Sequence, residues 1–203
     1  MSPWVTMFGG LRRGDPEEAE TYARQARAIS LRANGPDHPS VVSIDELLGR
    51  ILLATRRHQD GLALLRKALA DRRRLHGNAD PRVAGALTTL AQELQRHGDP
   101  VGAERAMEEA LAIRVATWGE DALLVAWTHR LLSELRLERG DLTGASASLD
   151  RAVAIAGNRL QPAHRDMQAL YRALTVLHER TGRTAEAARF RSKLRADALT
   201  GLR

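Results

Sequence analysis

A spacing of 42 residues recurs along nearly the whole chain and constrains its fold more than any other feature. One set of small residues keeps this spacing without an insertion or deletion: Ala19, Gly61, Ala103, Ala145 and Ala187. A second set keeps it five residues earlier: Gly14, Arg56, Gly98, Gly140 and Gly182. Self-similarity at a period of this size is the signature of stacked structural repeats. The sequence therefore predicts an array of units that contact their neighbours, not one globular core.

The stretch from Ala84 to Gly119 shows what one unit contains. Apolar residues recur along one face of a first helix: Leu87, Leu90, Ala91 and Leu94. Gly98 can then adopt the left-handed conformation of a helix end, Asp99 can cap the next helix, and Pro100 fits its first turn. A last set is expected to close the second helices: Gly35, Gly77, Gly119 and Gln161. Each unit is thus predicted to be a helix–turn–helix hairpin.

These motifs resemble tetratricopeptide repeats. Each unit carries a leucine followed by a smaller residue in its first helix: Leu48-Gly49, Leu90-Ala91, Leu132-Ser133 and Leu174-Thr175. The 42-residue period and the similar segments 35–41 and 77–83 are typical of the kinesin light chain-like subtype, here of a bacterial type. The resemblance implies an all-α fold, a right-handed α-solenoid of about five helix–turn–helix repeats of which the first is degenerate.

The two ends of the chain differ from the middle. Residues 1–13 align with the first helix of a unit but contain Pro3 and two glycines, so we expect a degenerate N-terminal half-repeat there. The array is expected over residues 14–198 and a short tail over residues 199–203. Arg191 and Arg195 replace apolar residues of earlier units, which predicts a polar outer face that ends the array. The N-terminus, in contrast, is open to being a cut from a longer protein.

Composition excludes several classes of protein. The chain has no cysteine, so a disulfide framework, a thiolate zinc site and a cysteine nucleophile are all excluded. It has no run of about 18 apolar residues, so no membrane span and no membrane partner are expected. Its first residues lack the pattern of a secretory signal. We therefore expect a cytoplasmic protein.

Arginine supplies almost all of the positive charge. Of the 31 lysines and arginines only Lys67 and Lys193 are lysines, which leaves 29 arginines, and the formal net charge is +6. Arginine suits the recognition of carboxylates and phosphates. A GC-rich genome would also favour arginine codons without a functional cause, and both interpretations stay open. No long basic block occurs, which argues against a nucleic-acid-binding tail.

No pattern of residues indicates catalysis. His178 and Glu179 are not followed by a second histidine at the zinc-protease spacing, and no phosphate-binding glycine loop is present. No serine lies in a hydrolase elbow. His38 and His164 fall near expected helix starts, where they can act as caps. We therefore expect no enzyme activity, no cofactor and no metal site.

Candidate binding residues come from the resemblance, which implies a concave wall lined by the first helices. We expect these residues to face a partner there: Arg50, Gln92, Arg96, Trp127, Arg130, Glu134 and Arg172. A rigid aromatic side chain such as Trp127 beside arginines is typical of a binding hot spot. The alternative is that Trp127 packs between helices and that the arginines are solvated. The asparagines that hold a peptide backbone in this subtype, and the lysine–asparagine carboxylate clamp, are absent here.

The function expected from this surface is that of a protein–protein interaction scaffold or adaptor, which binds a peptide or a partner domain and suits an acidic one. Two alternatives stay open. The array could be the sensor or regulatory arm of a multidomain bacterial signalling protein, or it could bind nucleic acid non-specifically through its arginines. The lack of aromatic stacking rows makes nucleic acid the weaker of these ideas. Self-association stays open as well.

Overall fold

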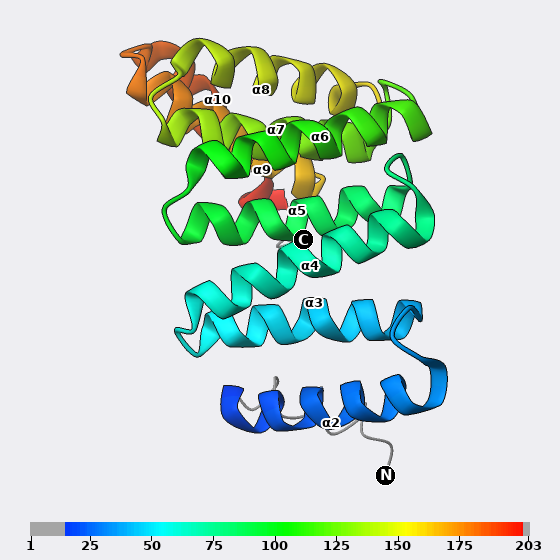
Figure 1. Ribbon diagram of the computed structural model, residues 1–203. Coiled ribbons are helices and arrows are strands. Elements are labelled where there is room, and N and C mark those ends of the chain that lie inside the picture. Colours follow the sequence, from blue (N-terminus) through cyan, green and yellow to red (C-terminus); the bar gives the residue numbers. More distant parts are fainter. Residues whose placement is uncertain (1–14, 201–203) are drawn as a thin grey trace. The chain divides into compact units, whose positions relative to one another are not determined.

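The computed structural model describes residues 15–200, with side chains up to residue 194. Every regular element in this range is a helix (Figure 1): α2 (Pro16–Asn34), α3 (Pro39–Ala54), α4 (His58–His76), α5 (Pro81–Arg96), α6 (Pro100–Trp118), α7 (Leu123–Glu138), α8 (Leu142–Gly157), α9 (Arg165–Arg180) and α10 (Thr184–Thr200). The predicted all-α array of helix–turn–helix units is confirmed. The predicted half-repeat over residues 1–13 and most of the predicted tail lie outside the described residues, although α10 runs on to Thr200.

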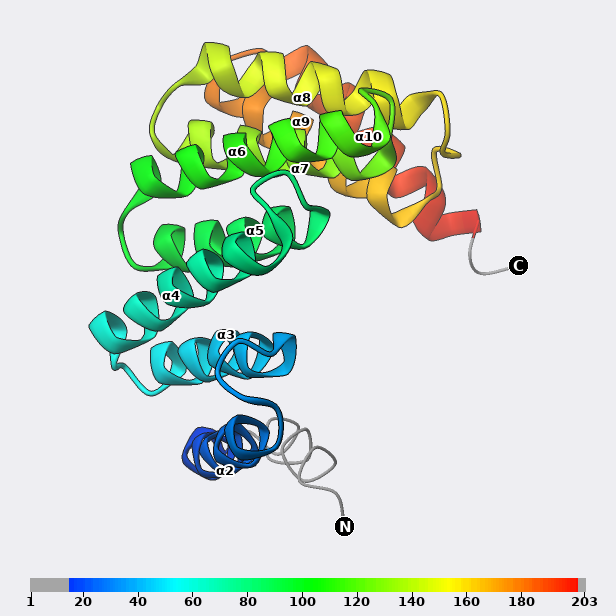
Figure 2. The ribbon, with the colours of Figure 1, turned by 45° about the vertical axis from the view of Figure 1, so that its right-hand side comes forward.

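The chain divides into two compact units, Met1–Ala106 and Met107–Arg203, and α6 begins in the first and ends in the second. In the first unit, α3 packs against both α2 and α4, and α4 packs against α5 (Figures 1 and 2). In the second unit, α7 packs against α8, α8 against α9, and α9 against α10. Each unit therefore repeats the same packing of one hairpin on the next.

Side-chain caps begin most of these helices, as the sequence predicts. His38 caps α3 by accepting a hydrogen bond from the Ser40 N–H, and His164 caps α9 in the same way with Asp166 N–H. Asp99 Oδ1 accepts from the Gly102 N–H at the start of α6, 2.8 Å away. Each cap satisfies a backbone donor that has no partner within its helix. The expected roles of both histidines and of Asp99 are confirmed.

The glycines of the hairpin turns are required by their conformation. Gly98, Gly140 and Gly182 have φ of 83°, 80° and 71°, in the left-handed region. Arg56 occupies the same place in the α3–α4 hairpin with φ of 62°, and it has the one positive φ among the described non-glycine residues. A side chain in this conformation costs about 1–2 kcal/mol.

We expect Arg56→Gly to raise the free energy of unfolding by up to about 1 kcal/mol, because it removes this strain. The gain is smaller than the strain itself, since glycine increases the conformational entropy of the unfolded chain. Urea unfolding measures the change. The reciprocal variant Gly98→Arg should lose about 1 kcal/mol. Equal stability of both variants and the parent chain would contradict the prediction.

The end of α8 differs from the expectation. Gly35, Gly77 and Gly119 follow their helices with φ of 81°, 84° and 81°. The 19-residue helices α2, α4 and α6 all end at such a glycine, whereas α8 has 16 residues and ends at Gly157. Gln161 therefore does not close α8 as predicted, because it does not supply the glycine that the other turns use.

Small residues let α3 and α4 approach each other closely. A Cβ atom added to Gly61 on α4 would lie 2.8 Å from the Gly49 carbonyl oxygen and 2.6 Å from Leu53 Cγ, both on α3. In the later hairpins the place of Gly61 is taken by alanine. The repeating small residue predicted from the 42-residue spacing is therefore a helix-contact residue, and this hairpin is the one in which even a methyl group does not fit.

Candidate partner-binding surface

A hollow of about 300 Å³ lies on the wall of the second unit, where α7 and α9 are in contact beside α8. We call it the α7–α9 hollow. Its apolar lining consists of Leu137, Ala145, Leu149, Ala169, Ala173, Val176 and Leu177. Val176 is 42% exposed, so the apolar lining of the hollow reaches solvent there. The remaining lining residues are polar: Arg130, Ser133, Glu134 and Arg172.

The charged residues of this hollow are not equivalent. Arg130 Nη1 donates to Glu134 Oε1 one turn further along α7, and the two form an ion pair. Burial raises the pKa of Glu134, and Arg130 opposes that rise only in part. Arg172 on α9 is exposed and forms no ion pair with any residue that the structure describes. The hollow therefore offers an apolar floor, one internally neutralised pair and one available guanidinium.

A second hollow, of about 430 Å³, lies in the first unit between α3 and α5. We call it the α3–α5 hollow. It is lined by Pro16, Leu47, Arg50, Ile51, Leu53, Ala54, Glu93, Arg96 and His97. Glu93 is buried and forms an ion pair with Arg96, while Arg50 is exposed without a described partner. This hollow thus combines the same groups as the first, an arginine–glutamate pair and one available arginine.

The structure groups most of the predicted binding residues into these hollows. Arg130, Glu134 and Arg172 line the α7–α9 hollow, and Arg50 and Arg96 line the α3–α5 hollow. The other two predicted residues, Gln92 and Trp127, are half-buried and line neither hollow. The indole N–H of Trp127 is buried without a hydrogen-bond partner, which favours packing over partner contact. Its predicted role as an anchor remains a prediction.

Models of known protein families match more than half of the chain. Tetratricopeptide repeat models match residues 11–40 and residues 40–116, so that the two ranges join without a gap. The chain is a tetratricopeptide repeat protein. Proteins of this class are typically non-catalytic scaffolds that bind other proteins.

Curated relatives of this repeat protein are much longer than it is. Clustered mitochondria protein homologs of Culex quinquefasciatus and Aedes aegypti are each 28% identical to it over 155 residues, which are 76% of the chain. The matched part is 11% of either relative, so the chain spans about a tenth of their length. In these relatives, the region similar to this array is a small part of a larger protein.

Solved structures share the solenoid fold of this repeat protein. A kinesin light chain of nearly identical TPR-like repeats from Podosopora anserina superposes with a TM-score of 0.85 at 21% identity, over 99% of this chain and 95% of that one. BtubC from P. vanneervenii gives 0.84 at 21% identity, over 98% and 79%. The apo form of RapI gives 0.80 at 16% identity, over 98% and 70%. The predicted kinesin light chain-like α-solenoid fold is therefore confirmed. That the repeats are of a bacterial type stays a prediction.

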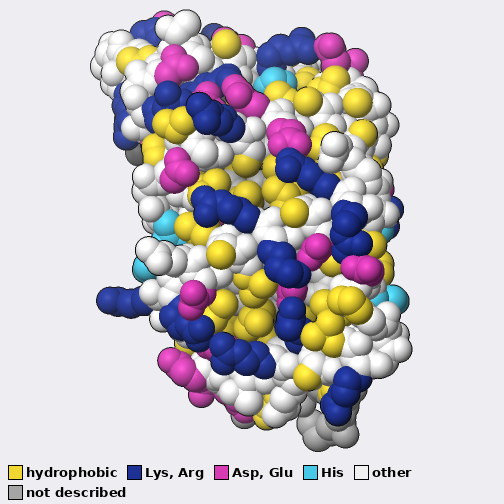
Figure 3. All heavy atoms as spheres, in the orientation of Figure 1, with side chains coloured by type: hydrophobic (Ala, Val, Ile, Leu, Met, Phe, Trp, Pro, Cys, Tyr) yellow, Lys and Arg dark blue, Asp and Glu magenta, His cyan; other side chains and the backbone are white. Residues whose placement is uncertain are grey.

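The charges of the array are mixed. On the face shown in Figure 3, arginine and lysine side chains lie among acidic and apolar ones without forming one basic block.

In residues 15–200 no helix is long and apolar enough to cross a membrane. No group of three or more histidines and carboxylates in that same range could hold a metal ion.

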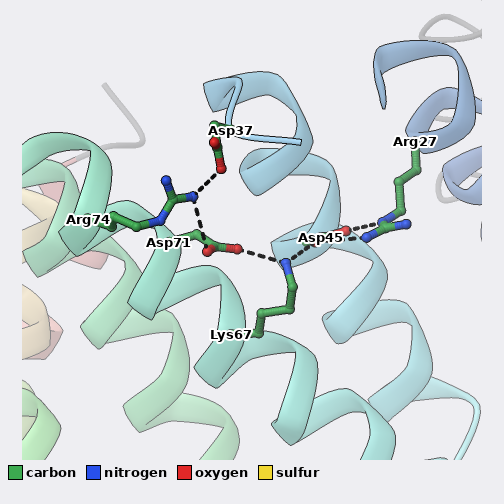
Figure 4. A network of polar contacts seen from close by, with 6 residues as sticks. All are labelled: Arg27, Asp37, Asp45, Lys67, Asp71 and Arg74. Atoms are coloured by element: carbon green, nitrogen blue, oxygen red, sulfur yellow. Dashed lines mark hydrogen bonds and ion pairs between the residues drawn. The ribbon is translucent and has the colours of Figure 1, made fainter. Parts of the chain in front are cut away.

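Sequence reasoning missed a charge network that joins three helices of the first unit (Figure 4). Asp45 on α3 has a fully buried side chain and accepts hydrogen bonds from Arg27 on α2 and from Lys67 on α4, the latter at 3.1 Å. Lys67 also donates to Asp71 at 2.7 Å, and this contact lowers the pKa of the Asp71 carboxyl despite burial. Asp45 therefore cross-links α2, α3 and α4 through its two cationic partners, and its role is structural.

A buried histidine packs inside the last hairpin. His178 on α9 is buried and stacks on Phe190 of α10, with ring centroids 5.5 Å apart. Burial lowers the pKa of His178, and Arg183 lowers it further, while Glu186 and Asp150 act in the opposite sense.

Because the charged imidazole is disfavoured in the folded state, the contribution of His178 to stability is complete above its unfolded pKa of about 6.5 and declines as the pH falls below that value. We expect His178→Leu to flatten the loss of melting temperature between about pH 7 and pH 5. Thermal unfolding by circular dichroism measures both chains. An unchanged pH profile in the variant would refute this assignment.

Proposed function

We propose that this protein is an interaction scaffold that holds a peptide segment of a partner protein in the α7–α9 hollow. The observation that carries the proposal is the combination of an exposed Val176 on an apolar floor with an unpaired Arg172 at the same hollow. A cavity of about 300 Å³ suits a few side chains of a peptide, not a whole domain.

The chemistry of the lining selects the partner segment. An apolar side chain of the segment would cover the exposed Val176 and remove its surface from water. A carboxylate on the same segment would accept hydrogen bonds from Arg172, whose planar guanidinium can donate two in parallel. The favoured ligand is therefore a segment with an acidic residue close to an aliphatic one. We propose that it belongs to a cytoplasmic partner.

The test uses peptides selected by the purified protein from a displayed library of random peptides. Arg172→Glu and Val176→Asp should each weaken the selected peptides by at least about tenfold, since each loses a favourable contact worth about 1.4 kcal/mol or more. Isothermal calorimetry measures the dissociation constants. The control is Arg189→Glu, which reverses the charge of an exposed arginine on α10 outside the hollow. Equal affinity for all three variants and the parent chain would overturn the proposal.

A second candidate function is favoured by the length of the relatives. Because the array corresponds to about a tenth of the clustered mitochondria protein homologs, it could also be one arm of a larger protein and bind a segment of that same protein. The length of the natural open reading frame separates an arm from a free adaptor. Light scattering of the isolated chain tests the related possibility of self-association.

A further inference from the structure

The α7–α9 hollow contains two arginines, but a ligand can bind only one of them without breaking an ion pair. Arg130 already holds Glu134, whereas Arg172 holds no acidic side chain in the described part of the chain. Resting on the function proposed above, we propose that Glu134 is a specificity-determining residue, an internal carboxylate that occupies Arg130 and restricts the hollow to ligands with a single carboxylate.

The geometry makes Glu134 difficult to displace. The side chain of Arg130 is 26% exposed and that of Glu134 is 41% exposed, so the pair is partly buried, on the Arg130 side more than on the Glu134 side. A ligand carboxylate that took Arg130 would leave the Glu134 carboxylate half-buried without its counter-ion. The incoming carboxylate would also lie beside the Glu134 carboxylate and be repelled by it, less strongly than in a dry site because Glu134 is partly exposed. Exchange of one carboxylate for another at Arg130 is therefore unfavourable.

The other arginine of α7, Arg136, is directed to Ser148 and Glu108 and not to Glu134. The charged residues facing Glu134 from α7 are Arg130 and Glu138, and Glu138 raises the pKa of Glu134 further by like-charge repulsion. From α9 the charged lining residue is Arg172, and α8 contributes only Ala145 and Leu149 to the hollow. If Glu134 moved to Arg172 it would occupy the one available guanidinium, so either position of Glu134 leaves a single arginine for the ligand.

The consequence is a rule for the ligand. A segment with one acidic residue beside an aliphatic residue satisfies Arg172 and leaves the Arg130–Glu134 pair intact. A segment with a second acidic residue directed at Arg130 meets the Glu134 carboxylate and is rejected by like-charge repulsion. Glu134 thus acts against the wrong ligand without contributing to the affinity for the right one.

The test compares selections from the same displayed library of random 12-residue peptides. The parent chain should enrich peptides with one acidic position next to an aliphatic residue. Glu134→Gln keeps the size of the side chain but frees Arg130, and it should enrich peptides with a second fixed acidic position and bind them at least about tenfold more tightly than the parent chain does. The matched control is Glu138→Gln, one turn further along α7, which leaves the pair intact and should select the parental motif.

The outcomes separate this inference from the proposed function. Enrichment of the same one-acid motif by Glu134→Gln would overturn the role of Glu134 while leaving the hollow as the binding site. Enrichment of two-acid peptides by the parent chain would overturn it as well. A parent chain that enriches no peptide, or peptides whose affinity Arg172→Glu does not change, would overturn both. Melting curves of the variants confirm that each is folded before selection.

Discussion

Arg27→Met is expected to lower the free energy of unfolding by about 3 kcal/mol. Asp45 has no exposed side-chain surface, and Arg27 is one of its two cationic partners. Without Arg27 the buried carboxylate keeps only Lys67, whose side chain is 53% exposed. Removing one partner of a buried ion pair typically costs about 3–5 kcal/mol. The remaining lysine and the partial exposure of Arg27 place this case at the lower end.

The control for this variant is Arg24→Met on the same helix. Arg24 forms an ion pair with Glu20, but its side chain is 54% exposed, so we expect a cost below about 1 kcal/mol. Adding Asp45→Asn to Arg27→Met should recover part of the loss, because it removes the unpaired charge. Urea unfolding of the four chains gives the values. Equal costs for Arg24→Met and Arg27→Met would show that the network does not stabilise the fold as argued.

Gly61→Ala is expected to lower the free energy of unfolding by about 2 kcal/mol, although alanine is the better helix former. Helix propensity alone favours the change by up to about 1 kcal/mol. The added Cβ would lie 2.8 Å from a backbone oxygen of α3, which cannot move without displacing that helix. Overpacking of this kind costs about 1–3 kcal/mol and outweighs the gain in propensity.

Gly85→Ala provides the opposite case on α5. Gly85 is also a helical glycine, but nothing lies within 4 Å of a Cβ atom added there. Propensity should act alone at this position and raise the stability by about 0.5–1 kcal/mol. Thermal unfolding of both variants measures the contrast. A stabilised Gly61→Ala chain would mean that α3 and α4 do not approach as closely as the structure shows.

The hairpins were predictable from the sequence because their signals are local. The helix-breaking glycines and the caps at His38 and His164 each act within a few residues of their own position, and the 42-residue spacing shows that such signals repeat along the chain. The same locality explains the error at the end of α8. The 42-residue spacing predicts a helix end at Gln161, but glutamine cannot replace the glycine on which the turn depends.

Features that depend on contacts between helices were not predictable in the same way. Asp45 is separated from Arg27 by 18 residues and from Lys67 by 22, and each partner lies on a different helix, so no spacing within one helix signals the contact. The candidate site was predicted only as rows of residues on one wall. Which of them share a hollow depends on the packing of α7 on α9 and of α3 on α5. The Arg130–Glu134 pair is the exception, since its four-residue spacing on one helix signals a contact.

The claim that the α7–α9 hollow is the partner site can be tested most directly with a single introduced thiol. The chain has no cysteine, so Val176→Cys would carry the one thiol in the molecule, and Ala188→Cys on α10 gives a matched exposed thiol outside the hollow. The rate of alkylation of each is measured with and without a saturating library-selected peptide. We predict that the peptide slows alkylation at position 176 by at least about tenfold and leaves position 188 unchanged. Protection of position 188, or of neither position, would contradict the account.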